Sequence, residues 1–539
     1  MLDSNLIHLQ EKARPGRRQL LVSSGILIVS RCIVAAAGFV VVVFIAARFG
    51  AGVDTDAYFM ARLIPVGIWI VLGYALNLSL IPTYMHTLAQ DGKEAAAKLA
   101  SDFLRLTLLV SLTLAVAYML FADQIIKVVA PGFSSEAQVL TVTLTQIMAF
   151  AMVFLGLYGV IDSILNASHR YILSALGSLW RPIGAIAGVL VLANFWQMRG
   201  VAIGILMGTA LQFATVVPGM RGKLVLKTIS VDLRNPRLKE TLKRLVLVLL
   251  VVGAGQINNI VDRVFASLAG KAAVSVFGFG QALIIVFPVL VAMPVYKVLY
   301  PEMLRLVATS DKEKLKQLFS WNIFLVAFIT IPITASLICF SVPATELAFQ
   351  HGRFSALAIE QTSDVIMYLS LTLCPTISCI LATYYFLATS RTKMLLQLMG
   401  VSIALNAVMA YGLMCLMGVA GVALSNSLGA MVRLGIILVF LRKAIGGFGG
   451  VRLIRPLVKI GAATTLTVMV IYLGARWLAT AVKLNGILDH IVAGTGFALA
   501  GLVIYVGLNG LFRNEQMLVL ITTLKKHVKL RRLVETQVS

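Results

Sequence analysis

The stretch SLIPTYMHTLAQDGKEAAAKL at residues 79–99 has a counterpart at residues 297–318, which read KVLYPEMLRLVATSDKEKLKQL. Each stretch places a proline near the end of an apolar segment, follows it with a short polar loop, and then opens a lysine-rich amphipathic segment. The two copies lie about 220 residues apart, and self-similarity at a fixed offset indicates an internal repeat. The sequence therefore predicts two related halves.

Three further pairs keep the same order along the chain. The pairs are APGFSSEAQVLTVTL (130–144) with QHGRFSALAIEQTSDVI (350–366), LNASHRYILSALGSL (165–179) with LATSRTKMLLQLMGV (387–401), and RGVAIGILMGTALQF (199–213) with MGVAGVALSNSLGAM (417–431). Parallel copies of this kind are typical of transporters, whose substrate path runs between the two halves.

The composition indicates a protein of many membrane spans. Only 13% of the residues are charged, about half the share found in soluble domains, which is about 25%. About fourteen apolar segments are long enough to cross a hydrocarbon core of ~30 Å. They are, within a few residues, 20–47, 63–85, 103–122, 139–165, 171–194, 199–217, 244–268, 273–300, 318–341, 360–388, 394–416, 419–441, 456–478 and 488–511.

We therefore predict an all-α polytopic membrane protein with two six-helix lobes in parallel repeat and two additional C-terminal helices. The predicted divisions are an N-lobe at 1–217, a basic cytoplasmic linker at 218–243, a C-lobe at 244–445, the last two spans at 446–512 and a basic tail at 513–539.

The net charge of +24 is explained by membrane topology, without a nucleic-acid partner. If the N-terminus is cytoplasmic, about 33 of the basic residues fall on the inner side and about 8 on the outer side, as the positive-inside rule requires. Both termini are therefore expected in the cytoplasm, with membrane lipids as neighbours of the basic face. The first apolar run, 20–47, is too long for a signal peptide.

No motif indicates catalysis or a bound cofactor. The five cysteines lie in apolar segments without CxxC or metal-ligand spacing, and we interpret them as small buried hydrophobes. There is no P-loop, nucleophile elbow or HExxH motif. We expect neither an enzyme nor a metal site.

The stretch SRCIVAAAGFVVVVFIAARFGAGVDTDAYFMARLIP (30–65) resembles the start of the MviN/MurJ family of lipid II flippases. Further segments resemble family signatures in the same order over about residues 20–445: VVAPGF, LNASHRY, GQINNIVDRVFASLAGKAAVS, VLYPEM, LAFQHGRFS and MGVAGVALSNSLGA. The family belongs to the multidrug/oligosaccharidyl-lipid/polysaccharide exporter superfamily. The resemblance implies fourteen helices in a bacterial inner membrane, a central cavity that opens alternately to each side, and a polyprenyl-diphosphate-linked saccharide as cargo.

The chain departs from the family pattern at several charged positions. The family usually has Arg-Asp soon after Gly-Phe in its first helix, where this chain has Val40, Val41 and Val42, and an Asp-Arg in its eighth helix, where this chain has Gln281 and Ala282. Arg31 is the cavity arginine that remains in register. The lost charges favour a variant cargo, such as an exopolysaccharide or O-antigen repeat unit, whereas the resemblance favours lipid II.

A charge within an apolar segment indicates a functional site, and the candidates selected among such residues are five basic ones together with the acids Asp162 and Asp262. Paired hydrogen bonds from arginines offset the cost of moving a diphosphate out of water. We therefore predict that Arg31, Arg181 and Arg433 bind the diphosphate, although Arg433 could equally reach the inner interface. The other two, Arg263 and Lys297, lie nearer the ends of their segments. For Lys297 the more favoured interpretation is a side chain that extends along the helix to the membrane–water interface.

The segment GQINNIVDRVFAS (255–267) carries the remaining candidates. Asp262 and Arg263 lie near the predicted outer end of their span, so we expect Arg263 to reach outward and Asp262 to pair with another helix. With Asp56 and Arg62 of the first outer loop they form a predicted outer gate. The deeper amides of Gln256, Asn258 and Asn259, together with Gln281, are predicted to line the cavity.

Three classes of function remain open. The first is a flippase for a lipid-linked saccharide, with or without a coupling ion. The second is a cation-coupled multidrug antiporter, which requires a titratable acid deep in a lobe. The third is a scaffold of a polysaccharide-assembly complex that transports nothing.

Overall fold

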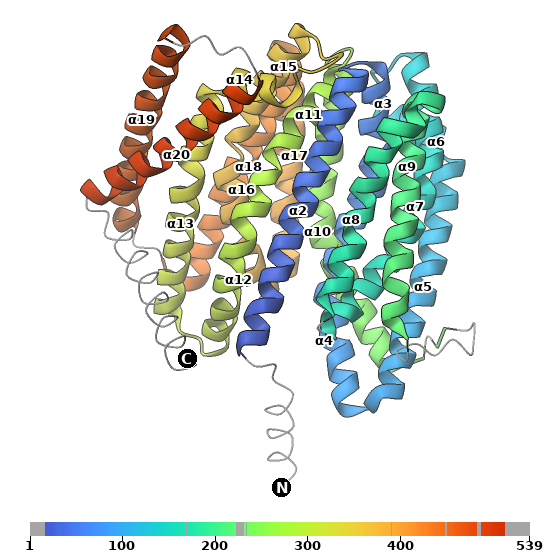
Figure 1. Ribbon diagram of the computed structural model, residues 1–539. Helices are drawn as coiled ribbons and strands as arrows, with labels where there is room; N and C mark the ends of the chain where they lie inside the picture. Colours follow the sequence, from blue (N-terminus) through green and yellow to red (C-terminus); the bar gives the residue numbers. More distant parts are fainter. Residues whose placement is uncertain are drawn as a thin grey trace, which may run out of the picture. The chain divides into compact units, whose positions relative to one another are not determined.

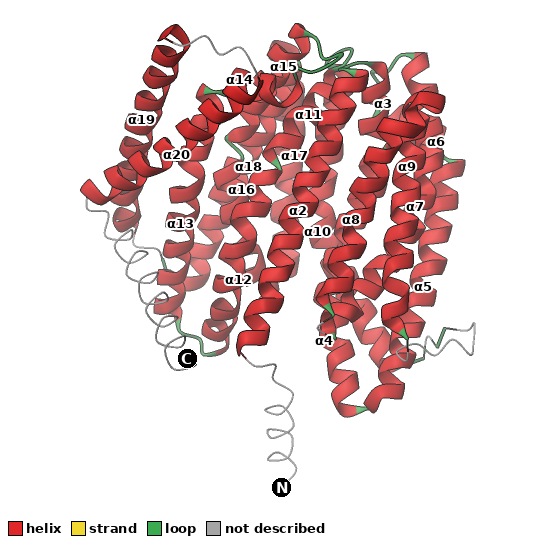
Figure 2. Cartoon of the chain, viewed as in Figure 1, coloured by secondary structure: helices red, strands yellow, loops and turns green. Residues whose placement is uncertain are grey.

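The structure is a computed structural model of the 539-residue chain, and it describes residues 17–168, 170–221, 231, 232, 234–389, 391–447, 450–481 and 487–512. Over these residues every regular element is a helix (Figure 2). The all-α prediction is therefore confirmed for this part of the chain.

The chain separates into two compact units, residues 1–275 and 276–539 (Figure 1). The helices of the first unit are α2 (Arg17–Phe49), α3 (Val53–Ala61), α4 (Leu63–Gln90), α5 (Gly92–Leu120), α6 (Ala122–Val129), α7 (Ser135–Ala167), α8 (Tyr171–Ala187), the π-helix η1 (Gly188–Leu192), α9 (Ala193–Val216), the 3-10 helix η2 (Val217–Met220) and α10 (Pro236–Leu268).

The second unit takes up the chain within α11 (Ala273–Ile284). It continues with α12 (Val286–Ala308), α13 (Lys312–Cys339), α14 (Ser341–Phe349), α15 (Ala356–Ser370), α16 (Leu373–Ala388), α17 (Thr392–Met417), α18 (Val419–Ile445), α19 (Gly450–Ala481) and α20 (Ile487–Leu511).

Ten helices in the described part of the chain are long and apolar enough to cross a membrane, or eleven if the bent pair α15 and α16 forms one span. One of the ten is the stretch Tyr171–Met220, which is interrupted at Gln197, where φ is 47° and ψ is −131°. The chain turns there, and α9 packs back on α8. The protein is therefore a multi-pass membrane protein, and the number fourteen stays a prediction.

The repeat is visible in the helix caps. Ser134 caps α7 by accepting a hydrogen bond from the backbone of Ala137, and Ser355 caps α15 by accepting one from Ala358. Each cap follows a short helix, α6 in one copy and α14 in the other. A serine at this position satisfies a free N–H of the first helical turn, so the shared Phe-Ser of the two loops has the same local role in each copy.

The copies differ where α15 meets α16. The corresponding helix in the first copy, α7, is continuous, whereas α15 and α16 are bent by 41° at the break around Leu371 and Thr372. Pro375 explains the break, because it cannot donate to the carbonyl of Leu371 and its ring crowds that turn.

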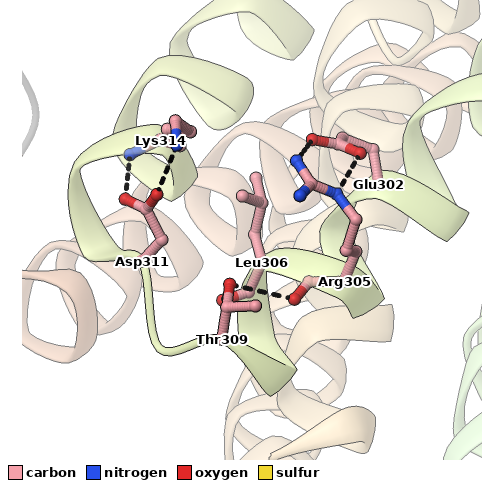
Figure 3. Close-up of polar contacts among 6 residues, drawn as sticks. All are labelled: Glu302, Arg305, Leu306, Thr309, Asp311 and Lys314. Carbon is pink, nitrogen blue, oxygen red and sulfur yellow. Dashed lines mark hydrogen bonds and ion pairs between the residues drawn. The ribbon is translucent and has the colours of Figure 1, made fainter.

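The turn between α12 and α13 pairs its basic residues with acids of the same turn (Figure 3). The Arg305 guanidinium makes two hydrogen bonds to Glu302, at 2.9 and 2.5 Å. Asp311 caps α13 through the Lys314 N–H at 3.1 Å and pairs with the Lys314 ammonium at 2.9 Å. These exposed pairs contribute little stability, about 0–1 kcal/mol each. They do not affect the topology argument, which counts Lys and Arg and not net charge.

Helix α7 is the central helix of the first unit. Its side chains Val160, Ile161 and Ile164 are buried against α4, α5 and α9. A helix that is buried on all sides must be apolar. Helix α7 is apolar along its length, and 78% of its most apolar stretch is buried. The first unit therefore has a rigid core from which α3, α8 and α9 present the site described below.

The predicted boundary between linker and C-lobe falls inside a helix. Asn235 caps α10 by accepting from Arg237, and Pro236 occupies the first helical position, which suits proline. Helix α10 then runs without interruption to Leu268 and packs on α4 within the first unit. The assignment of lobes at 1–217 and 244–445 stays a prediction based on the repeat.

Candidate functional site

A small cavity in the first unit is lined by two arginines, Arg62 and Arg181. Its volume is about 130 Å³, and its walls come from α2, α3, α4, α7, α8 and α9. No carboxylate is among the described residues that line it. Ligand pockets usually measure about 300–1,000 Å³, so in this structure the cavity is large enough for a phosphate-sized group but not for a saccharide.

Arg181 reaches this cavity from the middle of α8. Pro182 follows it and also lines the cavity. Proline removes one intrahelical hydrogen bond at this level of α8. Close packing of α8 on α9 fixes the helix pair, since a Cβ added at Gly184 would lie 2.4 Å from the Gly204 carbonyl oxygen. The position of Arg181 thus depends on glycines that let two backbones touch.

Arg62 follows α3 and contacts two aromatic rings. Its guanidinium lies 5.4 Å from the Tyr58 ring and 5.7 Å from the Phe59 ring, and it donates to the Tyr58 hydroxyl at 3.2 Å. The Arg263 guanidinium lies 5.5 Å from the same Phe59 ring. Cation–π contacts of this geometry are stabilising, so Phe59 holds two like charges in one place.

Asp56 is the anion of this cluster, and its side chain is only 4% exposed. It accepts hydrogen bonds from the backbone N–H of Ala272 at 2.9 Å and of Ser275 at 2.7 Å. Burial raises the pKa of Asp56 from 3.8 to about 6, although these hydrogen bonds and Arg263 lower it. The carboxylate therefore caps the start of α11 from a helix more than 200 positions earlier in the sequence.

The Asp56 bonds also fix an unusual backbone. Ala272 has a φ of 63°, a left-handed conformation that costs a residue with a side chain roughly 1–2 kcal/mol. The Ala272 N–H donates to the Asp56 carboxylate. Two residues later, the Val274 carbonyl accepts a hydrogen bond from Arg263 at 2.7 Å. We call Asp56, Phe59, Arg62, Arg263 and the backbone of 272–275 the Asp56 cluster.

The Arg263 side chain reaches the loop that follows its own helix, and its outward extension to the membrane interface stays a prediction. Arg263 is only 5% exposed and Asp262 is fully buried. The guanidinium turns back to the loop after its own helix, because the Val274 carbonyl and the Phe59 ring offer it partners there. The predicted gate residues Asp56, Arg62 and Arg263 do come together, and their role as a gate stays a prediction.

The predicted cavity amides lie apart from the arginine-lined cavity. Gln256 lines a different and larger cavity of about 430 Å³, and its side-chain carbonyl accepts from Asn259 at 3.1 Å. Asn258 lies beside them on α10, and Gln281 lies in α11. Neither is among the residues that line the two cavities.

The other predicted diphosphate ligands are Arg31 and Arg433. Arg31 lies in α2, one turn before Val34 of the cavity wall, and its side chain is outside the described part of the structure. Arg433 belongs to the second unit, where α18 presents it to Thr376 at 3.3 Å. The structure thus joins Arg181 to Arg62, a residue that the sequence assigned to the gate.

Some contributors could not be recognised from the sequence. Tyr58 lines the cavity and binds Arg62, yet it reads as an ordinary aromatic residue in a TDAY motif. Ala272 and Ser275 act through their backbone N–H groups, which no side-chain pattern reveals. No group of three potential metal ligands occurs among the residues that the structure describes.

The chain matches the model of the family described as lipid II flippase MurJ over residues 45–489. It is 24% identical over 435 residues to the lipid II flippase MurJ of Burkholderia cenocepacia, which covers 79% of this chain and 84% of that protein. It is 25% identical over 460 residues to the probable lipid II flippase MurJ of Rhizobium meliloti, with 82% and 84% covered.

Solved structures show the same fold. A lipid II flippase MurJ in an inward closed conformation matches with a TM-score of 0.75 at 21% identity, covering 92% of this chain and 99% of that one. An inward-facing multidrug resistance transporter of the MATE family, within the MOP superfamily, matches with a TM-score of 0.66 at 16% identity, covering 77% and 94%. Because the family model matches well over half of the chain, and the fold agrees, the chain belongs to the lipid II flippase MurJ family.

Proposed function

We propose that this protein moves a polyprenyl-diphosphate-linked saccharide from the inner to the outer leaflet of the bacterial cytoplasmic membrane. The observation that carries the proposal is the pair Arg62 and Arg181 on one cavity within a membrane-embedded unit. An arginine within a span, such as Arg181, is costly, and guanidinium ions bind phosphate oxygens through paired, charge-assisted hydrogen bonds. Family membership supports a lipid-linked cargo.

The cavity volume of about 130 Å³ leads to a proposal about the mechanism. A saccharide cannot enter a space of this size, so transport requires the cavity to widen toward one side and close toward the other. We propose alternating access of this kind, in which Arg181 holds the diphosphate while the path to one side of the membrane closes. No chemical step on the cargo is needed, and we propose a transporter and not an enzyme.

Two cargoes fit this proposal. Lipid II fits the family, and an exopolysaccharide or O-antigen repeat unit fits the neutral residues Val40, Val41 and Val42 at positions where family members usually carry charge. Both share the polyprenyl diphosphate that Arg62 and Arg181 would bind. The saccharide is the part that differs between them.

The antiporter alternative is supported by the likeness to MATE transporters. It needs a protonatable acid on the transport path. The buried acids among the described residues of the first unit are Asp56, Asp102, Asp162 and Asp262, and none of them lines either cavity. Asp162 accepts from Ser174 and from Asn166 and lies near the Tyr158 hydroxyl, and it lines neither cavity. It ties α7 to α8, which favours a structural role.

Reconstitution in liposomes tests the proposal. Lipid II or a lipid-linked repeat unit with a labelled sugar is placed in the inner leaflet, and its exposure to a membrane-impermeant reagent is followed over time. We expect protein-dependent exposure for at least one cargo. Arg181→Ala should reduce the rate at least tenfold and Arg181→Lys less, because lysine keeps the charge but loses the paired geometry.

Arg199→Ala is the matched control, because Arg199 is an exposed arginine of α9 that does not line the cavity. It should transport at the rate of the unmodified protein. Equal loss in Arg199→Ala and Arg181→Ala would indicate a general charge effect, and exposure that is independent of the protein for both cargoes would contradict a flippase.

A further inference from the structure

The larger cavity of the first unit is an apolar groove of about 430 Å³ bounded by α4, α5, α7 and α10. Its walls include Val71 of α4, Leu114 of α5, Met152 of α7 and Leu249 of α10. Polar side chains are few, and Gln256 is one of them. This groove shares no lining residue with the arginine-lined cavity.

The groove opens on exposed apolar side chains of two candidate membrane spans. Among its lining residues, Val110 is 48% exposed, Leu114 is 44% exposed and Ile257 is 50% exposed. They belong to α5 and α10, which are both apolar enough and long enough to span a membrane. An empty apolar groove would forfeit dispersion contacts along its walls, so in a bilayer it favours a hydrocarbon chain as its occupant.

One end of the groove carries positive charge. Lys239 lies three residues before the lining residue Leu242, which places it on the same side of α10, and Lys243 follows one turn later; both are exposed. Glu240 pairs with Arg244 at 2.7 Å, which leaves Lys239 and Lys243 without an ion pair among the described residues. A cationic end beside an apolar groove is complementary to an anionic headgroup on a hydrocarbon chain.

The length of the groove indicates the kind of chain. The α10 wall of the groove runs from Leu242 to Ile260, roughly 27 Å at about 1.5 Å per residue. Its part nearest Lys239 and Lys243, from Leu242 to Gly253, runs roughly 16 Å, about half of a ~30 Å hydrocarbon core. That is the depth of one leaflet. A phospholipid with its headgroup at Lys239 and Lys243 would therefore place the end of one acyl chain near Gly253.

We propose that the groove between α4, α5 and α10 binds an anionic phospholipid of the surrounding membrane, with one acyl chain on Leu242, Leu249 and Gly253 and the headgroup on Lys239 and Lys243. The site is separate from the proposed cargo site and does not depend on it. A bound chain joins α10 to α4 and α5 where the protein itself leaves a gap.

Native mass spectrometry of the detergent-purified full chain tests the proposal. The protein is titrated with phosphatidylglycerol or with phosphatidylcholine of the same acyl chains, and bound lipid is counted. We expect phosphatidylglycerol to be retained at least tenfold better. Lys239→Gln with Lys243→Gln should reduce its retention to that of phosphatidylcholine, since each lysine near a headgroup contributes about a fivefold preference. Lys271→Gln with Lys312→Gln is the matched control for charge and should bind normally.

Gly253→Leu tests the acyl chain. A Cβ at Gly253 would meet only Val71, at 3.9 Å, whereas one at Gly255 on the same helix would meet nothing within 4 Å, and Gly255 does not line the groove. Gly253→Leu fills the groove and should weaken both lipids about tenfold, the loss expected when about two methylene groups lose their contacts. Gly255→Leu should leave binding unchanged.

Equal retention of the two lipids by the unmodified protein would overturn the proposal. So would normal binding by a folded Gly253→Leu variant. If Gly253→Leu fails to fold, the lysine variants decide, and an undiminished preference for phosphatidylglycerol in them would overturn the headgroup assignment and with it the site.

Discussion

Replacing Asp56 with alanine gives the sharpest test of the Asp56 cluster. The change leaves two buried backbone donors, the N–H groups of Ala272 and Ser275, without their acceptor. An unsatisfied buried donor costs about 1–3 kcal/mol, so the two together cost about 2–6 kcal/mol. The change also removes the carboxylate that faces Arg263.

A second effect acts in the opposite direction. Burial raises the pKa of Asp56 from 3.8 to about 6, so at pH 7 the folded protein holds an ionised carboxylate at a cost of about 3 kcal/mol, taking 1.36 kcal/mol per pKa unit. Alanine relieves this cost. Subtracting about 3 kcal/mol from about 2–6 kcal/mol leaves a net effect of Asp56→Ala at pH 7 between a gain of about 1 and a loss of about 3 kcal/mol of unfolding free energy. At pH 5 the carboxyl of the folded protein is mostly protonated, so this relief is largely absent and the loss should approach about 2–6 kcal/mol.

Thermal unfolding in detergent at pH 5, followed by intrinsic tryptophan fluorescence, measures this loss where it is expected to be largest. Asp123→Ala is the control, because Asp123 makes an exposed pair with Lys127 one turn away, and such a pair contributes at most about 1 kcal/mol. Asp56→Asn keeps one acceptor and should fall between the two. If Asp56→Ala unfolds at the temperature of Asp123→Ala, the cap on α11 does not stabilise the fold and the reasoning fails.

The remaining predictions concern pH, packing and the surface. Between pH 4 and 6 the folded protein binds a proton at Asp56 that the unfolded chain does not, so the stability from this group is present below pH 3.8 and is lost as the pH rises to about 6. Unfolding temperatures measured at stepped pH should therefore fall across this range, and Asp56→Asn should remove this part of the fall. Gly204→Ala forces a Cβ to within 2.4 Å of the Gly184 carbonyl oxygen and should destabilise the folded protein by ~1–3 kcal/mol or more. Gly435→Ala is the control, because its Cβ meets nothing within 4 Å. Equal unfolding temperatures of the two variants would contradict the close α8–α9 contact. Lys98→Ala breaks an exposed pair with Asp232 at 2.7 Å and should change stability by less than ~1 kcal/mol, so a larger shift would show that the linker is anchored there.

Much of the fold follows from the sequence because hydrophobic length and repetition are local properties. Apolar segments of spanning length become helices, since a helix satisfies its backbone groups in hydrocarbon with hydrogen bonds of its own. The paired loops at 130–144 and 350–366 predicted matching helix starts, and Ser134 and Ser355 provide them. The exact start of α10 was not predicted, because the basic residues after Pro236 continue the same helix into the membrane.

The site was only partly predictable. The costly charges Arg181, Arg62, Asp56 and Arg263 are visible in the sequence because polar residues stand out among apolar ones. Their partners are not visible, since Asp56 and Arg263 bind backbone groups of 272–275 and any residue can supply those. Gln256 also looked like a cavity residue, and only the packing of α10 on α4 and α5 shows which cavity it lines.

The sequence by itself determined that this chain is helical, membrane-embedded, internally repeated and a relative of the lipid II flippases, because composition, period and motif order do not depend on contacts between distant residues. Only the tertiary structure decided that Arg62 and Arg181 share a cavity, that Arg263 donates to the Val274 carbonyl, and that an open apolar groove begins at Leu242, beside Lys239 and Lys243. The physical reason is that these features depend on how closely helix backbones approach one another, and that distance is set by packing around glycines such as Gly184 and Gly204.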